Sequence, residues 1–596
     1  MTRSEANRPS VPRPASGVWA ELIQIRPRKG RVKENLERIR EKLRVARGEL
    51  DLAVFPECVT SGYFVESAAA KVALTVEEVA EALGPSGAEE GPDVVLGFYE
   101  RDAGRVYNSV GWFSPDGEGY RPVHCHRKVF LPTYGVFDEA RFVSAGTGFQ
   151  AFDTRFGRVG LLVCEELLHT ISPTALALEG AEIIVAVAAS PAREFRPGIG
   201  RPESLERWDV VGRAVTLEHG VNLAIAQLVG SEGGKLFSGG SAFYFPGGKV
   251  GPRAPLLREG SARAFLDRSE VQRERIRTPL LSDLAERFPH FSSSVRPQGS
   301  TPTPGSSTPP VGAPDARALP DPADDSALAL DLPLVEEALI GFLRDEIVDR
   351  RGFTDVVVGV SGGVDSAVSC LLAVRALGIE HVHPFLLPYE TSSSESLDHG
   401  RLLLEVAGLE GRTIEITEGV DAYVRAEEPE LSGLRRGNLA ARFRAMVLWD
   451  QSARLRALPL GTGNKSERLL GYFTWHADDS PPINPLGDLF KTQVWALGRH
   501  LGVPEAIVDK APSADLVPGV NDEDELGVSY PVADRILHWL LEGYSASDLV
   551  RAGFGEGAVE QVRKRLEGTH WKRRLPTTAM ISSSAIGEFY LRPVDY

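Results

Sequence analysis

The sequence that points most directly to chemistry is an apolar run that ends in a Ser/Gly turn. Residues 356–360 are Val or Gly, and Ser361-Gly362-Gly363-Val364-Asp365-Ser366 follows before a helix-like stretch. Such a run predicts a parallel strand buried on both faces, and the glycines after it let backbone N–H groups approach an anion. The positive end of the following helix points at the same place. The stretch therefore predicts a loop that grips the pyrophosphate part of ATP.

The side chains of this turn add to the prediction. Ser361 and Ser366 supply hydroxyl donors, whereas Asp365 would repel a bare phosphate and makes sense if Mg²⁺ lies between them. The turn is not a Walker loop, because it lacks the G-x-x-x-x-G-K-[ST] spacing and contains no lysine. ATP and Mg²⁺ are therefore the expected ligands. The alternative is an ordinary strand-to-helix turn.

Three residues in the first half of the chain suggest amide chemistry. Glu57, Lys128 and Cys164 stand at the ends of strand-like runs or in the turns after them. A thiolate attacks an amide carbon, a carboxylate carries the thiol proton to the leaving amine, and an ammonium stabilises the oxyanion. Read singly, each residue also fits an inert core or a solvated surface. Together they predict covalent amide hydrolysis.

Alternating apolar runs and helical stretches must position these residues. In the first half, residues 35–47 read as a helix, and the strand-like runs are 18–25, 52–55, 94–98, 159–163, 183–187 and 223–228. This pattern predicts an α/β layered domain. In the second half, strands at 356–360 and 383–387 alternate with helices at 334–350 and 367–377. That order predicts a doubly wound, Rossmann-like parallel sheet with ligands at the carboxyl ends of its strands.

Composition divides the chain into two expected domains. Residues 292–333 are rich in Ser, Thr, Pro, Gly, Ala and Asp, which predicts a linker. Residues 1–16 are polar and rich in Pro and Arg, which predicts a disordered terminus. The expected domains are thus 17–291 and 334–596, and each has the size of one large domain.

Bulk properties narrow the class of protein. The 596 residues carry a formal net charge of −16, which argues against nucleic-acid partners and anionic membrane surfaces. No segment approaches membrane-spanning length. The four cysteines have no C-x-x-C spacing, which disfavours a disulfide framework or a structural zinc site: Cys58, Cys125, Cys164 and Cys370. A cytoplasmic protein with small-molecule partners is expected.

The strings around the three amide-chemistry residues resemble the nitrilase, or carbon–nitrogen hydrolase, superfamily. They are FPE…TSGY, RK…LP-x-YGVFDE and CEE. The resemblance implies an αββα sandwich and a catalytic triad of Glu57, Lys128 and Cys164. The match is closest to the glutaminase branch fused to NAD synthetase, which implies glutamine-binding residues at Tyr134, Glu165, Ser190 and Arg196. Residues 229–235 depart from the Gly-Gly-Gln-Asp-like stretch of that branch.

The SGGVDS turn resembles the loop of the PP-loop ATP pyrophosphatases. Downstream strings resemble NAD synthetase in particular: GNLAARFRAM, LGTGNKSERLLGYFT, INPLGDLFKTQV and PSADLVPGVNDEDELGVSY. Taken together, both halves resemble the glutamine-dependent NAD synthetase family. The resemblance implies that ATP converts nicotinic acid adenine dinucleotide to an acyl-adenylate with loss of pyrophosphate. Ammonia from glutamine then displaces AMP. It also implies a homo-oligomer.

The resemblance assigns residues in the second half to three ligands. For ATP they are Ser361, Gly362, Gly363, Val364, Asp365, Ser366 and Thr462. For the dinucleotide they are Asn438, Glu467, Asp478, Lys491 and Lys572. For Mg²⁺ they are Asp365 and Glu467.

Two departures from the family pattern keep alternatives open. Trp475 stands where the family has Lys, and Pro482 stands where it has Asp. One alternative is a PP-loop amidotransferase that acts on a different carboxylate. Another is a non-catalytic nucleotide-binding sensor, against which the retained residues of both expected sites argue.

Overall fold

The computed structural model describes residues 17–45, 50–84, 91–294, 319–427, 430–513 and 521–573. The predicted disordered terminus, residues 1–16, lies outside these ranges. Residues 295–318 of the predicted linker also lie outside them. The described chain forms two compact units. The first comprises residues up to Arg193 and from Glu203 to 294, and the second comprises Glu194–Pro202 and the residues from 319 onward.

The first unit contains two mixed six-stranded sheets. One has the order β14-β1-β2-β3-β4-β5, with β1, β2 and β3 parallel. Its strands are β1 (Gly17–Gln24), β2 (Leu52–Val54), β3 (Asp93–Asp102), β4 (Arg105–Pro115), β5 (Tyr120–Arg127) and β14 (Gly260–Asp267).

The second sheet of this unit has the order β13-β12-β9-β8-β7-β6, with β7, β8 and β9 parallel. Its strands are β6 (Phe152–Thr154), β7 (Gly157–Val163), β8 (Ile183–Ala188), β9 (Asn222–Gln227), β12 (Ala242–Phe245) and β13 (Lys249–Arg253). A separate antiparallel hairpin is formed by β10 (Val229–Glu232) and β11 (Lys235–Ser238).

Alternate residues of β1 divide the core of the first unit, because successive strand residues point to opposite faces. Leu22 belongs to an apolar cluster that joins residues of both sheets. Ile23 packs with α1 (Val32–Val45) and α3 (Val76–Leu83) on the outside of the first sheet.

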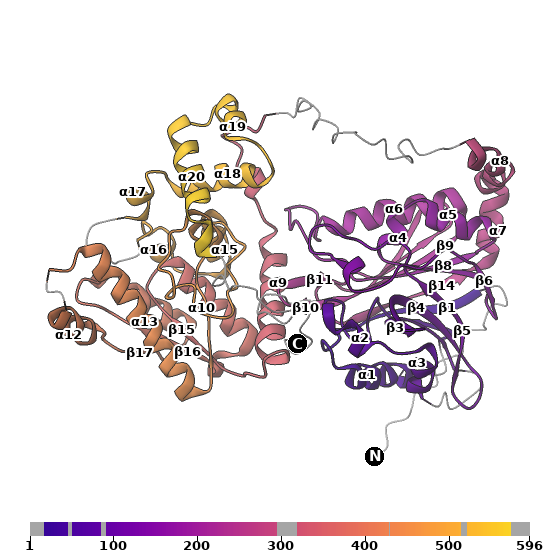
Figure 1. Ribbon diagram of the computed structural model, residues 1–596, viewed down its shortest axis with the longest axis horizontal. Coiled ribbons are helices and arrows are strands. Elements are labelled where there is room, and N and C mark those ends of the chain that lie inside the picture. Colours follow the sequence, from indigo (N-terminus) through magenta and orange to yellow (C-terminus); the bar gives the residue numbers. More distant parts are fainter. Residues whose placement is uncertain are drawn as a thin grey trace, which may run out of the picture. The chain divides into compact units, whose positions relative to one another are not determined.

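Helices α5 (Ile171–Leu178) and α6 (Ser204–His219) cover the second sheet. Figure 1 shows these four layers in turn, which confirms the predicted αββα sandwich. Shorter or peripheral helices complete the unit: α2 (Ala69–Val72), α4 (Glu165–Leu168), α7 (Arg268–Arg277) and α8 (Leu280–Ser294).

The second unit is built on a parallel sheet of order β17-β16-β15-β18. Its strands are β15 (Val356–Gly359), β16 (Val382–Leu386), β17 (Arg412–Thr413) and β18 (Leu458–Pro459). The strand order reverses between β15 and β18, and ligands bind at such switch points in open α/β sheets.

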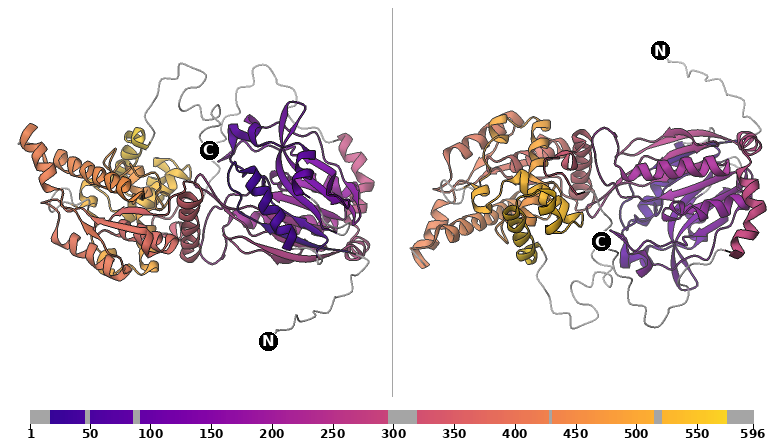
Figure 2. Two further views of the ribbon diagram at one scale, coloured as in Figure 1. Left: turned by 90° about the horizontal axis from the view of Figure 1, so that it is seen from below. Right: turned by 90° about the horizontal axis from the view of Figure 1, so that it is seen from above.

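Helices pack on both faces of this sheet. On one face, Val356 and Val358 belong to an apolar cluster with residues of α9 (Leu332–Arg344), α10 (Val364–Leu377) and α15 (Lys491–Leu501). Val357 packs with α12 (Thr417–Glu427) and α13 (Gly433–Leu455) on the other. Figure 2 shows the sheet between these helices, and the predicted doubly wound fold is confirmed. The predicted helix at 334–350 is interrupted, because a π-helical turn occupies Asp345–Asp349.

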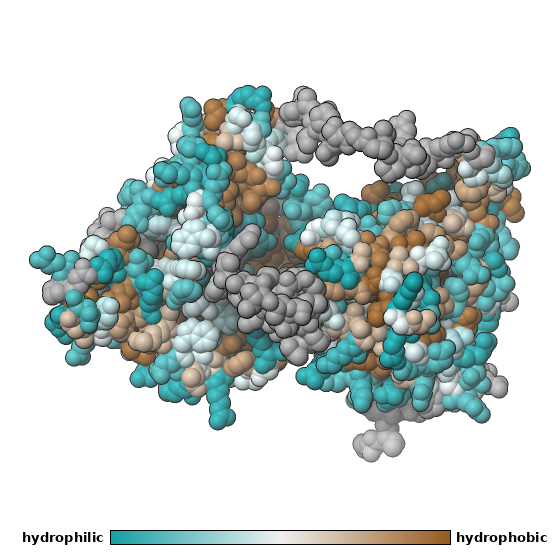
Figure 3. Space-filling view, viewed as in Figure 1, coloured by the Kyte–Doolittle hydropathy of each residue, from teal (hydrophilic) through white to brown (hydrophobic). Residues whose placement is uncertain are grey.

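Buried residues of α18 (Tyr530–Leu541) form a separate apolar cluster with residues of α14 (Lys465–Leu470), α17 (Asp522–Leu526), α19 (Ala546–Ala552) and α20 (Glu556–Gly568). Buried residues of α11 (Ser394–Ala407) and α16 (Glu505–Val508) belong instead to the cluster that contains Val356 and Val358. Within the described ranges, no helix is both long and apolar enough to cross a membrane. In Figure 3, hydrophilic residues cover much of the visible face, with smaller apolar areas between them.

Candidate functional site

Cys164 lies in the turn between β7 and α4. Its φ angle is 49°, and a non-glycine residue in this left-handed region costs on the order of 1–3 kcal/mol. The Cys164 N–H donates to the carbonyl of Val187 (2.8 Å), which fixes the turn to β8. Burial raises the pKa of the Cys164 thiol well above its usual range, and the charge of Glu57 raises it further. The thiol is therefore protonated at rest, so it needs a base to become a nucleophile.

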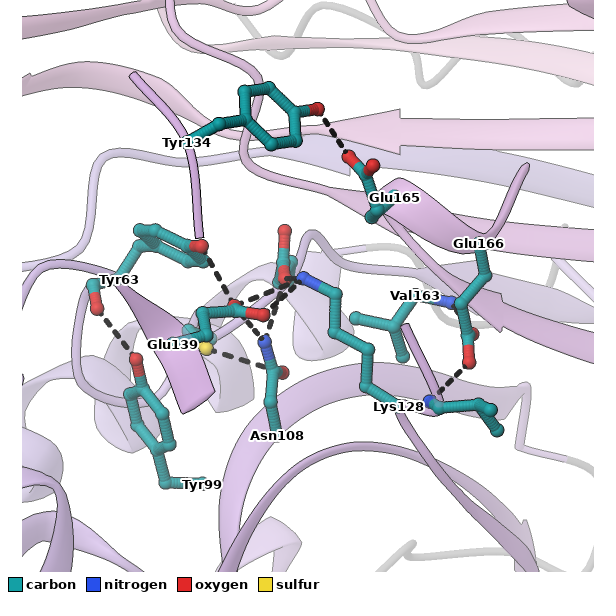
Figure 4. Close-up of polar contacts among 12 residues, drawn as sticks. Tyr63, Tyr99, Asn108, Lys128, Tyr134, Glu139, Val163, Glu165 and Glu166 are labelled. Atoms are coloured by element: carbon teal, nitrogen blue, oxygen red, sulfur yellow. Dashed lines mark hydrogen bonds and ion pairs between the residues drawn. The ribbon is translucent and has the colours of Figure 1, made fainter. Parts of the chain in front are cut away.

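Lys128 is fully buried between two carboxylates. Its Nζ lies 3.0 Å from Glu57 Oε1 and 2.9 Å from Glu139 Oε2. Asn108 Nδ2 donates to both groups, at 2.8 Å to Glu57 Oε1 and 2.9 Å to Glu139 Oε1. Figure 4 shows Lys128, Asn108 and Glu139 pointing toward one another. Burial works to lower the pKa of Lys128, but Glu139 and Glu57 outweigh it and raise the pKa, so the ammonium stays charged.

The two carboxylate oxygens of Glu57 differ in their hydrogen bonding, because Oε1 accepts from Asn108 and Lys128 and Oε2 does not. Burial raises the pKa of Glu57, while Lys128 acts in the opposite direction. Glu57 Oε2 is buried and has no hydrogen-bond partner among the residues that the structure describes. Burying a carboxylate oxygen without a hydrogen-bond partner destabilises the fold, so such an oxygen in a native protein calls for an explanation, such as a catalytic role. It is suited to accept a proton from the Cys164 thiol, on which the charges of Glu57 and Lys128 both act.

The sequence interpretation missed two members of this cluster. Glu139 shares Lys128 with Glu57, yet it lies eleven residues away from that lysine in the chain. Its signal was present, because it is the last residue of the quoted string YGVFDE. Asn108 lies within β4 and has no comparable signal in the sequence.

The structure brings together two of the four predicted glutamine-binding residues. Tyr134 OH donates to Glu165 Oε2 (2.7 Å), and Glu165 is the residue after Cys164 (Figure 4). Ser190 Oγ instead accepts a hydrogen bond from Trp208 Nε1 (3.1 Å).

The fourth, Arg196, lies in Glu194–Pro202, which belongs to the second compact unit. Its Nε is 3.9 Å from Glu194 Oε2. The neighbouring residue Phe195 packs against the core of the second unit, and its carbonyl accepts from the Asp331 N–H (2.8 Å).

The predicted pyrophosphate loop is held by its own serines. Ser361 Oγ and Ser366 Oγ are 3.1 Å apart, and Ser366 Oγ donates to the carbonyl of Gly363 (2.9 Å). Gly362 has a φ angle of 80°, and a Cβ built there would lie 2.0 Å from the carbonyl oxygen of Ser396. Only glycine fits both this backbone conformation and this close approach.

A cavity of about 320 Å³ opens at the carboxyl ends of β15, β16 and β18. Predicted ATP and dinucleotide residues that line it are Ser361, Gly363, Val364, Asp365, Ser366, Thr462, Glu467, Asp478 and Lys491. The cavity has the place expected for a ligand of a doubly wound sheet. Three further predicted residues, Gly362, Asn438 and Lys572, lie outside the described lining.

Lys491 joins the two predicted metal ligands. Its Nζ contacts Asp365 Oδ2 directly and lies 3.4 Å from Glu467 Oε1. Asn464 Nδ2 donates to the other oxygen of Asp365 (2.8 Å). Burial and the charge of Asp365 raise the pKa of Glu467 to about 8, although Lys491 opposes this.

The same contacts test whether Mg²⁺ fits. Asp365 and Glu467 direct oxygens at one cation already, the Lys491 ammonium. No cluster of three or more His, Cys, Asp or Glu side chains suited to a metal occurs in the described ranges. Mg²⁺ in nucleotide enzymes is commonly held by one or two carboxylates, with phosphates and water completing its shell. Two carboxylates beside a phosphate loop fit that pattern.

Two basic residues of the cavity were missed by the sequence interpretation. Lys510 Nζ donates to the Oγ of Ser396 (2.6 Å), the residue in the first turn of α11 that Gly362 approaches. Arg444 Nε donates to the carbonyl of Leu387 (3.0 Å). Lys510 stands two residues before the quoted PSADL string, whereas Arg444 lies inside the quoted GNLAARFRAM string.

The two predicted dinucleotide residues outside the lining make structural contacts. Asn438 Oδ1 accepts from Thr474 Oγ1 (2.9 Å). Lys572 Nζ donates to the carbonyls of Gly471 (2.8 Å) and Phe473 (2.9 Å). Both therefore fix the segment that follows α14.

The two departures from the family pattern also lie outside the described lining. Trp475 packs against His476, with ring centroids 4.2 Å apart, and against Trp571, at 5.1 Å. The neighbouring residues Pro481 and Asp479 do line the cavity, whereas Pro482 does not.

Comparison with known proteins matches two families to the two parts of the chain. Residues 20–276 match the carbon-nitrogen hydrolase family, and residues 335–576 match the NAD synthase family. The NH(3)-dependent NAD(+) synthetase of Chlorobaculum parvum is 46% identical over 261 residues, which are 44% of this chain and 94% of that protein. The enzyme of the same name from Fusobacterium nucleatum is 40% identical over 255 residues, or 43% and 98%.

Two solved structures share the fold over nearly the whole chain. A glutamine-dependent NAD+ synthetase from Acinetobacter baumannii, solved in complex with ADP, is 23% identical with a TM-score of 0.68 and covers 96% of this chain and 97% of its own. A glutamine-dependent NAD(+) synthetase from Cytophaga hutchinsonii is 16% identical with a TM-score of 0.67, covering 94% and 93%. These structures thus share both folds within one chain.

Proposed function

The chain belongs to the NAD synthetase family and carries a carbon-nitrogen hydrolase domain ahead of its synthetase domain, and from this we propose that it is a glutamine-hydrolysing NAD synthase. It amidates nicotinic acid adenine dinucleotide with ammonia taken from glutamine, and it consumes ATP. The observation that carries the proposal is the Glu57–Lys128–Glu139 cluster beside Cys164 in the same chain as the phosphate loop. A synthetase supplied only with free ammonia would need no amide-hydrolysing site.

Glutamine hydrolysis follows from the first site. The Cys164 sulfur bonds to the amide carbon of glutamine as its proton moves to Glu57, and the Lys128 ammonium stabilises the oxyanion. The C–N bond then breaks while Glu57 protonates the departing nitrogen, leaving ammonia and a thioester. Glu57 next takes a proton from water, which attacks the thioester and releases glutamate; that proton returns to the thiol. In this proposal Tyr134 and Glu165, which are hydrogen-bonded to each other, bind the amino-acid part of glutamine.

NAD formation takes place at the second site. A carboxylate is a poor electrophile, so ATP first converts that of the dinucleotide to an acyl-adenylate. Pyrophosphate leaves onto the donors of the Ser361–Ser366 turn, where backbone N–H groups and hydroxyls stabilise its charge. Ammonia then bonds to the acyl carbon, the bond between this carbon and the phosphate oxygen of AMP breaks, and the nitrogen loses one proton as the carboxamide forms. Asp365 and Glu467 would hold Mg²⁺, which neutralises phosphate charge when bound.

Assembly and domain limits belong to the same proposal. The two catalytic domains span residues 17–291 and 334–596, joined by 292–333. The protein acts on small molecules as a homo-oligomer. The domain limits are supported by the composition of residues 292–333, and the homo-oligomer by the resemblance to the family.

The test measures NAD formation from the dinucleotide, ATP and Mg²⁺, with either glutamine or ammonium as nitrogen source. Cys164→Ala should abolish the glutamine-driven reaction and keep the ammonium-driven one. Cys125→Ala, a cysteine on β5, is the matched control and should keep both. NAD formed by neither source in the unaltered protein would contradict the proposal and favour another carboxylate as acceptor.

A further inference from the structure

The hairpin β10–β11 contains residues 229–235, which depart from the Gly-Gly-Gln-Asp-like stretch of the glutaminase branch, and its first strand ends in a buried carboxylate. Glu232, the last residue of β10, is only 4% exposed. Its two oxygens accept from the Tyr63 N–H at 3.1 and 3.0 Å, and Oε2 also accepts from the Phe64 N–H at 2.7 Å. The steps of amide hydrolysis described above make no use of Glu232.

The segment Gly62–Phe64, which Glu232 binds, leaves space for the carboxylate because it contains a glycine. Gly62 has a φ angle of 80°, and a Cβ built there would lie 2.8 Å from Glu232 Oε1. Burial raises the pKa of Glu232, while the two backbone donors and the charges of Lys29 and Lys235 lower it. Lys235 Nζ also lies 4.5 Å from the centre of the Phe64 ring. The carboxylate and its cationic neighbours thus clamp this turn of the backbone.

Tyr63 connects the clamp to the catalytic cluster. Its hydroxyl donates to Glu139 Oε1 (2.7 Å), and its ring centre lies 5.8 Å from Lys128 Nζ. Its carbonyl accepts from Tyr99 OH (2.6 Å), which holds the Tyr63 backbone at a second point. Because Glu139 and Glu57 share one ammonium, the position of Tyr63 sets where Glu139 and Lys128 lie relative to Glu57.

We propose that Glu232 is a positioning residue for amide hydrolysis, which acts through Tyr63 to hold Glu139 and Lys128 in place. The inference deepens the proposed glutaminase function and rests on it. Glu232 touches neither the reacting sulfur nor the amide. Its role is to fix the backbone from which the Tyr63 hydroxyl reaches Glu139.

Glu232→Gln is the variant that tests this role. Glutamine has nearly the same shape, but its NH₂ group cannot accept, so the Tyr63 N–H loses one of its two acceptors. We expect kcat for glutamine hydrolysis to fall about 10- to 100-fold with KM little changed, as for small misplacements of catalytic groups. NAD formation from ammonium should be unchanged. Glu232→Asp, which keeps both acceptor oxygens, should retain more activity than Glu232→Gln.

A double-mutant cycle separates positioning from general stability. If Glu232 acts through Tyr63, then Glu232→Gln combined with Tyr63→Phe should lose no more activity than the worse single variant. Multiplied losses would overturn the inference. Asp93→Asn is the matched control, because Asp93 is a buried carboxylate of the same unit that accepts from Trp112 Nε1 and Ser114 Oγ at the amino end of β3. It should lower thermal stability without the loss of kcat.

The rate at which chloroacetamide alkylates Cys164 provides a readout without glutamine turnover. Glu232→Gln should slow this reaction in the folded protein, and Asp93→Asn should not. Failure of the unaltered protein to hydrolyse glutamine would count against the proposed function, while the alkylation rates would still decide the role of Glu232. Equal alkylation rates and equal kcat in the Glu232→Gln and unaltered proteins would overturn the inference.

Discussion

The thiol of Cys164 differs from a preformed thiolate in how it should respond to pH. Burial and Glu57 both raise the pKa of this thiol. The thiol should therefore lose its proton at a pH above the ordinary cysteine pKa of about 8.5. The rate of alkylation by iodoacetamide should therefore keep rising through pH 9 in the substrate-free protein. Mass spectrometry of the labelled Cys164 peptide between pH 6 and 10 measures this rate. A plateau below pH 8 would show a thiolate and contradict the prediction.

The Lys491 ammonium lies between Asp365 and Glu467, the two carboxylates that would hold the proposed Mg²⁺. Two like charges 4 Å apart repel by about 4 kcal/mol at an effective dielectric constant of 20, so the ammonium should oppose a divalent cation. Lys491→Met should therefore bind Mn²⁺ about 10- to 100-fold more tightly than the unaltered protein when nucleotide is absent. Electron paramagnetic resonance of free Mn²⁺ measures the difference.

Lys510→Met is the control for this measurement. Lys510 lines the same cavity, but its Nζ donates to Ser396 Oγ instead of a carboxylate. Its replacement should change Mn²⁺ affinity much less. If the two variants bind Mn²⁺ equally, Lys491 has no special place at the metal position.

The sequence alone predicted some residues of the two candidate sites but not others. Cys164 and the SGGVDS turn were found because each directly follows an apolar strand, where side chains of parallel sheets converge. Glu139 lies eleven residues from Lys128 and within a string that carries the resemblance, so its signal was present in the sequence. Asn108 became visible only in the fold, since its contact with Glu57 joins residues 51 positions apart in the chain. The clamp between Glu232 and Tyr63, 169 residues apart, has the same origin.

At the scale of elements, the turn between β15 and α10 depends on a glycine for two separate reasons. Gly362 adopts a positive φ, and its Cα approaches Ser396 at the start of α11. Gly362→Ala should weaken ATP binding, because Ser396 has to move and the loop donors move with it. The affinity for ATP, measured by calorimetry, and the thermal midpoint are both expected to fall.

Gly352→Ala separates the two reasons. Gly352 has a similar φ of 70°, but a Cβ built there meets nothing within 4 Å. Its replacement should cost only the backbone strain of about 1–2 kcal/mol and leave ATP affinity unchanged. Equal losses of ATP affinity in both variants would show that strain alone, not the contact with Ser396, governs the loop.

Two of the strands that the sequence revealed are buried on both faces. The runs at 183–187 and 223–228 correspond to β8 (Ile183–Ala188) and β9 (Asn222–Gln227), whose residues are all buried. Strands β17 and β18 have two residues each, which is too short for a periodic pattern. The π-helical turn at Asp345–Asp349 also escaped prediction, because its residues continue the periodicity of α9.

At the scale of the whole molecule, two sites with different chemistry must exchange one small nucleophile. Ammonia released into water at neutral pH is mostly ammonium, which is not a nucleophile. Placing both sites in one chain is useful only if ammonia reaches the acyl-adenylate before it mixes with solvent. We therefore expect direct transfer between the two active sites.

Isotope competition measures that transfer. The protein is supplied with glutamine labelled with ¹⁵N at the amide and with an equal concentration of unlabelled ammonium. The mass of the NAD product is then measured by mass spectrometry. Direct transfer predicts that most of the carboxamide nitrogen is ¹⁵N from the first turnovers onward. Cys164→Ala, which keeps the second site, should give only ¹⁴N product under the same conditions. If the label in NAD instead matches the mixed pool of ammonium in solution, ammonia leaves the protein between the two reactions, and the joining of two domains in one chain serves another purpose.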